Sequence, residues 1–353
     1  MKFIKLPALI ALLAMMLVPA SAARHKKDVQ PPWPDLLLDG GRKLTYENTF
    51  SSQRDIRGKT GLWTKLAEAV VGEPDYRQMA RPYGIAIDSR GRLIVTDPGA
   101  NGVHIFDPAQ HKYKFLERQD KSRDSMFQPQ CVAVDAKDNI YVTDSDAGKV
   151  FVFEPNGKLR RVLGSLKGGE GFFKRPTGIA IDPGTQNIYV SDTLRDQIFV
   201  MDPDGQVLRT IGKRGIGQGE FRLPTHLLFQ NGTLVVVDAL NFRVQFLDRD
   251  GTFRGMIGSA ADPNSGIYRP KGIAVDSEGH IYLAESEWGN VQVFDREGNL
   301  LYTFGNGTGF GQFHLPAGLF IDRADRVFVV DSYNHRVQVF QYHALGTVAG
   351  GGR

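Results

Sequence analysis

Cysteine is almost absent from this chain of 353 residues, since Cys131 is its single copy. One cysteine cannot form an internal disulfide, so an apolar core must stabilise the fold even in an oxidising compartment. The sequence also lacks Cys-x-x-Cys-His and Gly-x-Ser-x-Gly. The first absence excludes a covalently attached c-type haem, and the second removes a common signature of serine hydrolases.

A large excess of charge of one sign is also missing. The chain has 43 Lys and Arg against 39 Asp and Glu, and removal of a leader containing Lys2 and Lys5 leaves 41 against 39. Arg81, Arg175 and Arg269 could form a basic rim for RNA. A near-neutral exported chain, however, has neither the charge nor the location for that role. We therefore expect no nucleic-acid partner.

No run is long enough to predict an integral membrane span. The apolar run from Leu6 to Val18 is shorter than the ~20 residues a spanning helix needs, and small residues follow it at positions 20–22. Residues 1–22 are therefore predicted to be a signal peptide, and the mature chain is expected to be periplasmic or secreted. Residues 23–43 contain three prolines and a Gly-Gly pair, which predicts a flexible linker.

A repeat of 46 to 48 residues dominates the rest of the chain. It begins with a proline before an apolar run, at Pro82, Pro129, Pro176, Pro224, Pro270 and Pro316. A carboxylate recurs in phase, at Asp97, Asp144, Asp192, Asp238, Glu285 and Asp331. Each unit has four short β-patterned runs separated by turn residues, which is typical of propeller blades. We predict an all-β, six-bladed propeller over residues 44–343.

The two ends of the repeat complement each other. The sixth unit lacks a fourth strand, because residues 344–353 are short, glycine-rich and predicted to be a disordered tail. Residues 44–50 carry Tyr46 and Phe50 at the spacing of Val207 and Ile211 in the third unit. An N-terminal strand should therefore complete the last blade and remove an open edge, which disfavours a linear solenoid and favours a monomer.

A long insertion lies between this closing strand and the first blade, over residues 51–81. Within it, residues 62–71 place four apolar residues on one helical face, before Gly72 and Pro74: Leu62, Trp63, Leu66 and Val70. This pattern predicts a short amphipathic helix, whose apolar face would dock on its own domain or on a partner.

The repeat consensus resembles the NHL repeat over six units, about residues 76–343. Its clearest copies are RPTGIAIDPGTQNIYVSD, RPKGIAVDSEGHIYLAES and LPAGLFIDRADRVFVVDSYNHRVQVF. With its leader, the chain looks like exported bacterial NHL-repeat proteins. Peptide-amidating lyases of this type hold zinc with histidines around the axis. The equivalent positions here are Gly84, Cys131, Gly178, His226, Gly272 and Gly318, which offer only one histidine. The calcium ligands of gluconolactonase-like propellers are not found either.

The candidate binding residues gather on one rim. We define the linker face as the rim that carries the blade-to-blade connections, the starts of the first strands and the turns between second and third strands. The predicted channel mouth consists of Tyr83, Gln130, Thr177, Thr225, His226 and Lys271. The predicted outer rim consists of Leu194, Leu240, Glu285, Trp288 and Tyr333.

The six carboxylates of the repeat are predicted to accept backbone hydrogen bonds in their turns rather than to hold a metal. Glu285 is the exception put forward for a specialised role, because its side chain is longer. We expect no cofactor and no catalytic set. The favoured function is a binding scaffold for a protein or an extended peptide or glycan, with an accessory role in a cell-envelope assembly as one form of it. The alternative is a metal-dependent hydrolase or lyase that uses His226, Glu285 and Tyr83.

Overall fold

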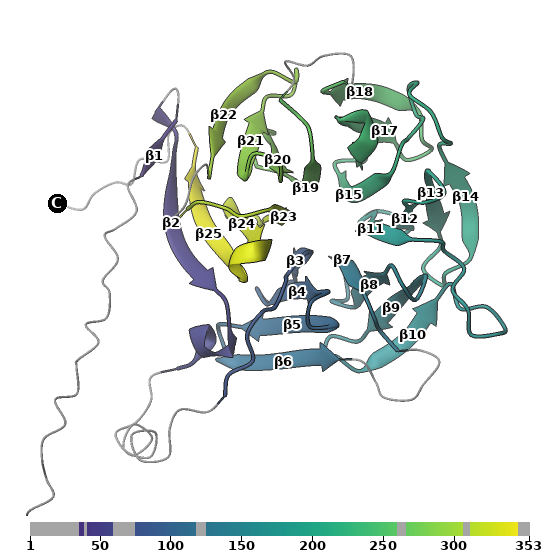
Figure 1. The fold of residues 1–353 in the computed structure, drawn as a ribbon, viewed down its shortest axis with the longest axis horizontal. Coiled ribbons are helices and arrows are strands. Elements are labelled where there is room, and N and C mark those ends of the chain that lie inside the picture. Colours follow the sequence, from purple (N-terminus) through teal and green to yellow (C-terminus); the bar gives the residue numbers. More distant parts are fainter. Residues whose placement is uncertain are drawn as a thin grey trace, which may run out of the picture. The chain divides into compact units, whose positions relative to one another are not determined.

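Six antiparallel sheets are arranged around a common axis in the computed structural model (Figure 1). The structure describes residues 35–38, 41–58, 75–117, 125–259, 266–305 and 311–344, which belong to one unit. The strands of the first three blades, from the axis outward, are β3 (Ile85–Ile87), β4 (Leu93–Asp97), β5 (Gly102–Asp107) and β6 (Lys112–Glu117); β7 (Pro129–Val134), β8 (Ile140–Asp144), β9 (Lys149–Phe153) and β10 (Leu159–Leu163); and β11 (Pro176–Ile181), β12 (Ile188–Asp192), β13 (Gln197–Met201) and β14 (Val207–Ile211).

The other three blades follow the same order around the ring. Their strands are β15 (Pro224–Gln230), β16 (Thr233–Asp238), β17 (Arg243–Asp248) and β18 (Phe253–Ile257); β19 (Pro270–Val275), β20 (Ile281–Glu285), β21 (Asn290–Phe294) and β22 (Leu300–Phe304); and β23 (Pro316–Ile321), β24 (Arg326–Asp331), β25 (Arg336–His343), β2 (Lys43–Phe50) and β1 (Leu36–Leu37). The prediction of an all-β, six-bladed propeller with four-stranded blades is confirmed, with β1 as an additional strand.

Burial along each blade follows from the packing of sheets on both faces. Every residue of β4, β8 and β12 is buried, which explains their continuous apolar runs. In the outer strand β18 buried positions are confined to the end, and exposed residues alternate with half-buried ones. The core lies between neighbouring blades: Val103 and Ile105 of the first blade pack with Ile140 of the second.

The last blade is closed by β2, as predicted. β2 pairs antiparallel with β25, and Tyr46 lies opposite Phe340 while Phe50 lies opposite Val337. Figure 1 shows the N-terminal strand beside the last strands of the chain. The third blade has the same register, with Val207 opposite Met201 and Ile211 opposite Ile198. The spacing match seen in the sequence thus corresponds to an equivalent place in the sheet.

The N-terminal boundary of the propeller needs correction. Leu36 and Leu37 pair with β2, and Leu38 is buried, so the C-terminal part of the linker predicted over residues 23–43 belongs to the last blade. The predicted signal peptide, the helix at residues 62–71 and residues 345–353 of the predicted tail lie outside the described residues. Within the described ranges the helices are short 3-10 turns: η2 (Gln53–Ile56), η3 (Ala239–Asn241) and η5 (Ser332–Asn334). None of the helices described could cross a membrane.

Candidate binding site on the linker face

Close contact between neighbouring first strands determines the geometry at the axis. A Cβ atom on Gly178 would lie 1.9 Å from the carbonyl oxygen of Thr225, and one on Gly84 would lie 2.6 Å from that of Gln130. Such distances are far below van der Waals contact, so glycine is required for the strands to approach this closely. The repeated glycine therefore reflects packing around the axis.

Hydroxyl groups on the second strands join adjacent blades. The Thr143 hydroxyl donates to the carbonyl oxygen of Thr177 at 2.9 Å, and the Ser191 hydroxyl donates to that of Thr225 at 2.6 Å. Thr96 makes the equivalent bond to Gln130. Because each acceptor directly follows a repeat proline, these bonds hold the residues of the predicted channel mouth at fixed positions.

The linker face contains a cavity of about 720 Å³, which we call the linker-face cavity. Eight of the eleven predicted binding residues line it: Tyr83, Gln130, Thr177, Leu194, Thr225, Leu240, Lys271 and Tyr333. They come from all six blades, so the periodicity of the sequence brings residues of different blades to a shared surface. His226, Glu285 and Trp288 are not among its lining residues.

Trp288 lies beside this cavity instead. Its side chain is exposed, and its ring stands edge-on to that of Tyr268 with 5.7 Å between the centroids. Tyr268 itself lines the cavity. Trp288 thus extends the same surface outward.

Glu285 is buried, so the prediction that places it among the binding residues of the exposed rim is wrong. Its side chain is fully buried and accepts hydrogen bonds from the backbone N–H groups of Tyr268 and Arg269 at 2.8 to 3.0 Å. It also accepts one from Glu287. The longer side chain therefore reproduces the turn bonds of aspartate, which the sequence analysis did not expect.

The other repeat carboxylates have the predicted structural role. Asp97 accepts from the backbone N–H groups of Ala80 and Arg81, and Asp192 accepts from those of Lys174 and Arg175. Asp97 and Asp192 thereby fix the residues that precede Pro82 and Pro176. All six residues at that position line the cavity: Arg81, Gln128, Arg175, Leu223, Arg269 and Leu315. From the sequence, Arg81, Arg175 and Arg269 were considered only as a rim for RNA, and Gln128, Leu223 and Leu315 were not identified, although the proline period marks all six positions.

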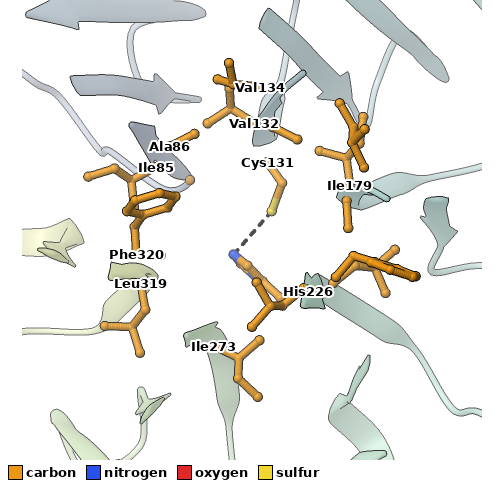
Figure 2. A pocket seen from close by; sticks show the side chains of 18 of the residues that line it. Ile85, Ala86, Cys131, Val132, Val134, Ile179, His226, Ile273, Leu319 and Phe320 are labelled. Carbon is orange, nitrogen blue, oxygen red and sulfur yellow. Dashed lines mark hydrogen bonds between the residues drawn. The ribbon is translucent and has the colours of Figure 1, made fainter. Parts of the chain in front are cut away.

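His226 lies deeper than predicted, in a second cavity rather than at the mouth. This inner cavity measures about 260 Å³ and is lined mostly by apolar residues of the first strands, including Ile179 and Ile273. Figure 2 shows the His226 ring pointing across it toward Cys131, and the two side chains meet with 3.2 Å between Nε2 and Sγ. The His226 ring also lies near that of Tyr83, with 5.6 Å between the two ring centroids.

Burial controls the protonation of this pair. It lowers the pKa of His226 to about 3, with a smaller contribution from the charge of Lys271, and it raises the pKa of the Cys131 thiol. His226 Nδ1 is buried and has no hydrogen-bond partner among the described residues. The pair is therefore a neutral imidazole and thiol at neutral pH, and neither group is poised for proton transfer.

The His226 shift predicts acid sensitivity. A histidine whose folded pKa lies below the unfolded value near 6.5 contributes stability that is lost as the pH falls from about 6.5 to about 3. When the pH falls from 6 to 4.5, the wild type should therefore lose about 2 kcal/mol more unfolding free energy than His226→Leu. The difference follows from about 1.4 kcal/mol per pH unit for one proton. Urea unfolding at both pH values measures this. Parallel losses in the two proteins would contradict it.

The residues named for a metal site do not come together. His226 lies in the inner cavity, whereas Glu285 is enclosed by backbone N–H groups. In the part of the chain that the structure describes, no three His, Cys, Asp or Glu side chains form a group that could hold a metal ion.

Comparison with known families agrees with this architecture. The NHL repeat family matches residues 128–153, 268–294 and 313–340, and a family described as a 6-bladed beta-propeller matches residues 181–253. The chain is an NHL-repeat six-bladed β-propeller. Protein brain tumor of Drosophila melanogaster is 28% identical to this NHL propeller over 109 residues, which span 30% of this chain and 10% of that protein.

Solved structures share the fold at low identity. Virginiamycin B lyase from Staphylococcus aureus is 13% identical with a TM-score of 0.55, covering 85% of this chain and 99% of the lyase. An auxiliary nutrient binding protein from Bacteroides thetaiotaomicron is 12% identical with a TM-score of 0.58, covering 75% and 70%. A nidogen/laminin complex contains a chain 19% identical with a TM-score of 0.52, covering 76% and 91%. Identities this low show the fold alone.

Proposed function

We propose that the NHL propeller binds a partner protein or an extended ligand across its linker face and has no chemistry of its own. The observation that carries this proposal is the linker-face cavity, which gathers side chains from all six blades. Loops and turns on a rigid scaffold are the usual location of binding residues, and the residues that line this cavity include no His, Cys, Asp or Glu.

Exposed apolar side chains around the cavity support binding of a large partner. We call Leu194, Leu240 and Tyr333 the apolar rim, and they are 52%, 46% and 48% exposed. Trp288, beside the cavity, is 56% exposed. Aromatic and large apolar residues that converge on one concave surface are typical of interface anchors.

The similar folds do not decide between binding and catalysis. Some are described as lyases, and others as nutrient-binding proteins or as part of a nidogen/laminin complex. The residues of the site, and not the fold, therefore distinguish between these functions, because one fold supports many activities. The metal-dependent alternative has no support in the site, since His226 and Glu285 are separated and enclosed.

The predicted leader places this binding activity outside the cytoplasm. We propose that the mature chain works in the periplasm or is secreted, and that its partner belongs to a cell-envelope assembly. The apolar leader and its small-residue cleavage site support this location.

Truncation of two residues of the apolar rim should strongly reduce the recovery of partner proteins. The double variant Leu240→Ala, Tyr333→Ala is expected to recover at least tenfold less partner in cross-linked pull-downs from envelope extracts, because truncated anchors lose buried apolar contact. Each recovered protein is identified and quantified by mass spectrometry.

A matched control removes exposed apolar groups elsewhere. Leu208 and Leu300 lie on the outer strands β14 and β22 and are about half exposed. Leu208→Ala, Leu300→Ala should recover partners like the wild type. If the rim variant recovers as much partner as the wild type, the linker face is not the binding surface.

A further inference from the structure

The lining of the linker-face cavity is charged with one sign. Arg81, Arg175, Arg269 and Lys271 all line it, and we call them the cationic cluster. Its lining residues include no Asp or Glu. The chain as a whole is nearly balanced, with 43 basic and 39 acidic residues, so this separation of charge is local. The cavity is therefore an electropositive hollow on a near-neutral protein.

Among the described residues, few side chains neutralise this cluster. Arg269 pairs with Glu287 at 3.3 Å, but both side chains are about half exposed, so the pair is weak. Arg81, Arg175 and Lys271 form no ion pair with any of the described residues. The ammonium group of Lys271 instead lies 5.9 Å from the centroid of the Tyr83 ring.

The cations also repel one another. Burial lowers the pKa of Lys271, and the charges of Arg269 and Arg175 lower it further, while Cys131 and Glu285 act in the opposite direction. Like charges that are held close together without a counterion raise the free energy of the unliganded protein. A bound anion would relieve this repulsion, so the cavity favours a negatively charged ligand.

The backbone holds the arginines in place before any ligand arrives. The N–H groups of Arg81, Arg175 and Arg269 donate to the buried carboxylates of the same blades, at 2.9, 3.0 and 2.8 Å. These arginines occupy equivalent positions in the first, third and fifth blades. The backbone positions from which these arginine side chains extend are thus fixed around the cavity, which limits the entropic cost of binding a ligand with several separated charges.

The apolar rim favours an extended polypeptide over a small inorganic anion as the ligand. A small inorganic ion could contact one or two cations but would leave the exposed Leu194, Leu240 and Tyr333 uncovered. An extended polypeptide can present carboxylates and apolar side chains along one segment. A cavity of about 720 Å³ has room for several of its side chains.

We propose that the linker-face cavity binds an extended acidic peptide segment of a partner protein, with carboxylates against the cationic cluster and apolar side chains against the apolar rim. This inference rests on the proposed function, since it names the part of the partner that enters the cavity. It requires that the affinity depend on the negative charge of the peptide and on the positive charge of the cationic cluster.

Fluorescence anisotropy with two labelled peptides tests this directly. The probe is a ten-residue peptide of alternating Glu and Phe, and its matched partner has Gln in place of each Glu. The full-length mature chain should bind the Glu peptide at least tenfold more tightly than the Gln peptide. The difference should shrink in 0.5 M salt, because screening weakens attraction between exposed charges. Equal affinities would overturn the proposal.

Charge removal from the protein provides the second arm. The triple variant Arg81→Gln, Arg175→Gln, Lys271→Gln should weaken binding of the Glu peptide at least tenfold. The matched control changes three exposed cations outside the cavity, Lys137, Arg160 and Arg323, to Gln and should bind like the wild type. Thermal unfolding curves establish that all three proteins are equally folded. Undiminished binding by the cluster variant would refute the inference.

Two further probes separate other anions from peptides. Inorganic phosphate at 10 mM should not displace the Glu peptide, and a labelled ten-residue oligothymidylate should bind at least tenfold more weakly. Displacement by phosphate, or tighter binding of the oligonucleotide, would reject an acidic peptide as the ligand. If the cluster variant retains envelope partners that the rim variant loses, this inference fails while the proposed function stands. If the rim variant retains them, the proposed function itself fails.

Discussion

A chain that begins at Ser51 is expected to aggregate on expression, because it lacks the strand that closes the ring. Its last blade would expose the edge of β25 along the seven residue pairs that β2 makes with it. The buried side chains of Leu44 and Phe50 would be lost from two separate core clusters at the same time. An exposed edge and a missing core face both promote intermolecular pairing. Gel filtration should show oligomers or insoluble protein in place of a monomer.

A second truncation serves as the control for this result. A chain that begins at Asp35 keeps β1, β2 and the buried Leu38, and should elute as a monomer with the thermal stability of the mature protein. A synthetic peptide covering residues 35–50 should also bind the shorter chain and reduce its aggregation. A soluble monomer that starts at Ser51 and melts like the longer chain would show that closure by β2 is dispensable.

The substitution Gly178→Ala should cost about 3 kcal/mol or more of unfolding free energy. Its Cβ atom would lie 1.9 Å from the carbonyl oxygen of Thr225 and 2.8 Å from the Ser191 hydroxyl oxygen. Backbone on the neighbouring first strand must therefore move, and the hydrogen bond from Ser191 to Thr225 must lengthen or break. Urea unfolding of the wild type and the variant measures the loss.

Gly184 provides the matched control in the same blade. An added Cβ there would lie 3.4 Å from the nearest atoms, which belong to the side chains of Arg249 and Asp182. Gly184→Ala should therefore change stability by less than about 0.5 kcal/mol. A loss for Gly178→Ala no larger than this would mean that the first strands can separate without cost.

The architecture could be predicted because the same pattern of strand and turn residues occurs in six copies. Prolines, carboxylates and apolar runs in phase define both the number of blades and the strand order within each. Even the register of closure follows from spacing, since Tyr46 and Phe50 lie opposite Phe340 and Val337. The exception is the boundary: Leu36 and Leu37 form a strand, although the surrounding prolines and glycines are typical of a linker.

The sequence predicted the site residues correctly where their backbone position determines whether they line the cavity. It failed where the direction or length of the side chain determines this. The residues after each proline line the cavity because the strand period places them there. His226 is one residue further along the strand, and it points into the inner cavity toward Cys131. Glu285 was mistaken for a rim residue because the spacing says nothing about whether a longer carboxylate can still reach backbone N–H groups.

By itself, the sequence determined a closed ring of six blades and the face on which its turns gather, since periodic strands can bury their apolar residues only against neighbouring copies. Tertiary structure alone decided that two cavities lie near the axis and that four cations line one of them, of which only Arg269 forms an ion pair with a described residue. The reason is physical: net charge is a property of composition, whereas an unneutralised charge depends on the distances between side chains from different blades.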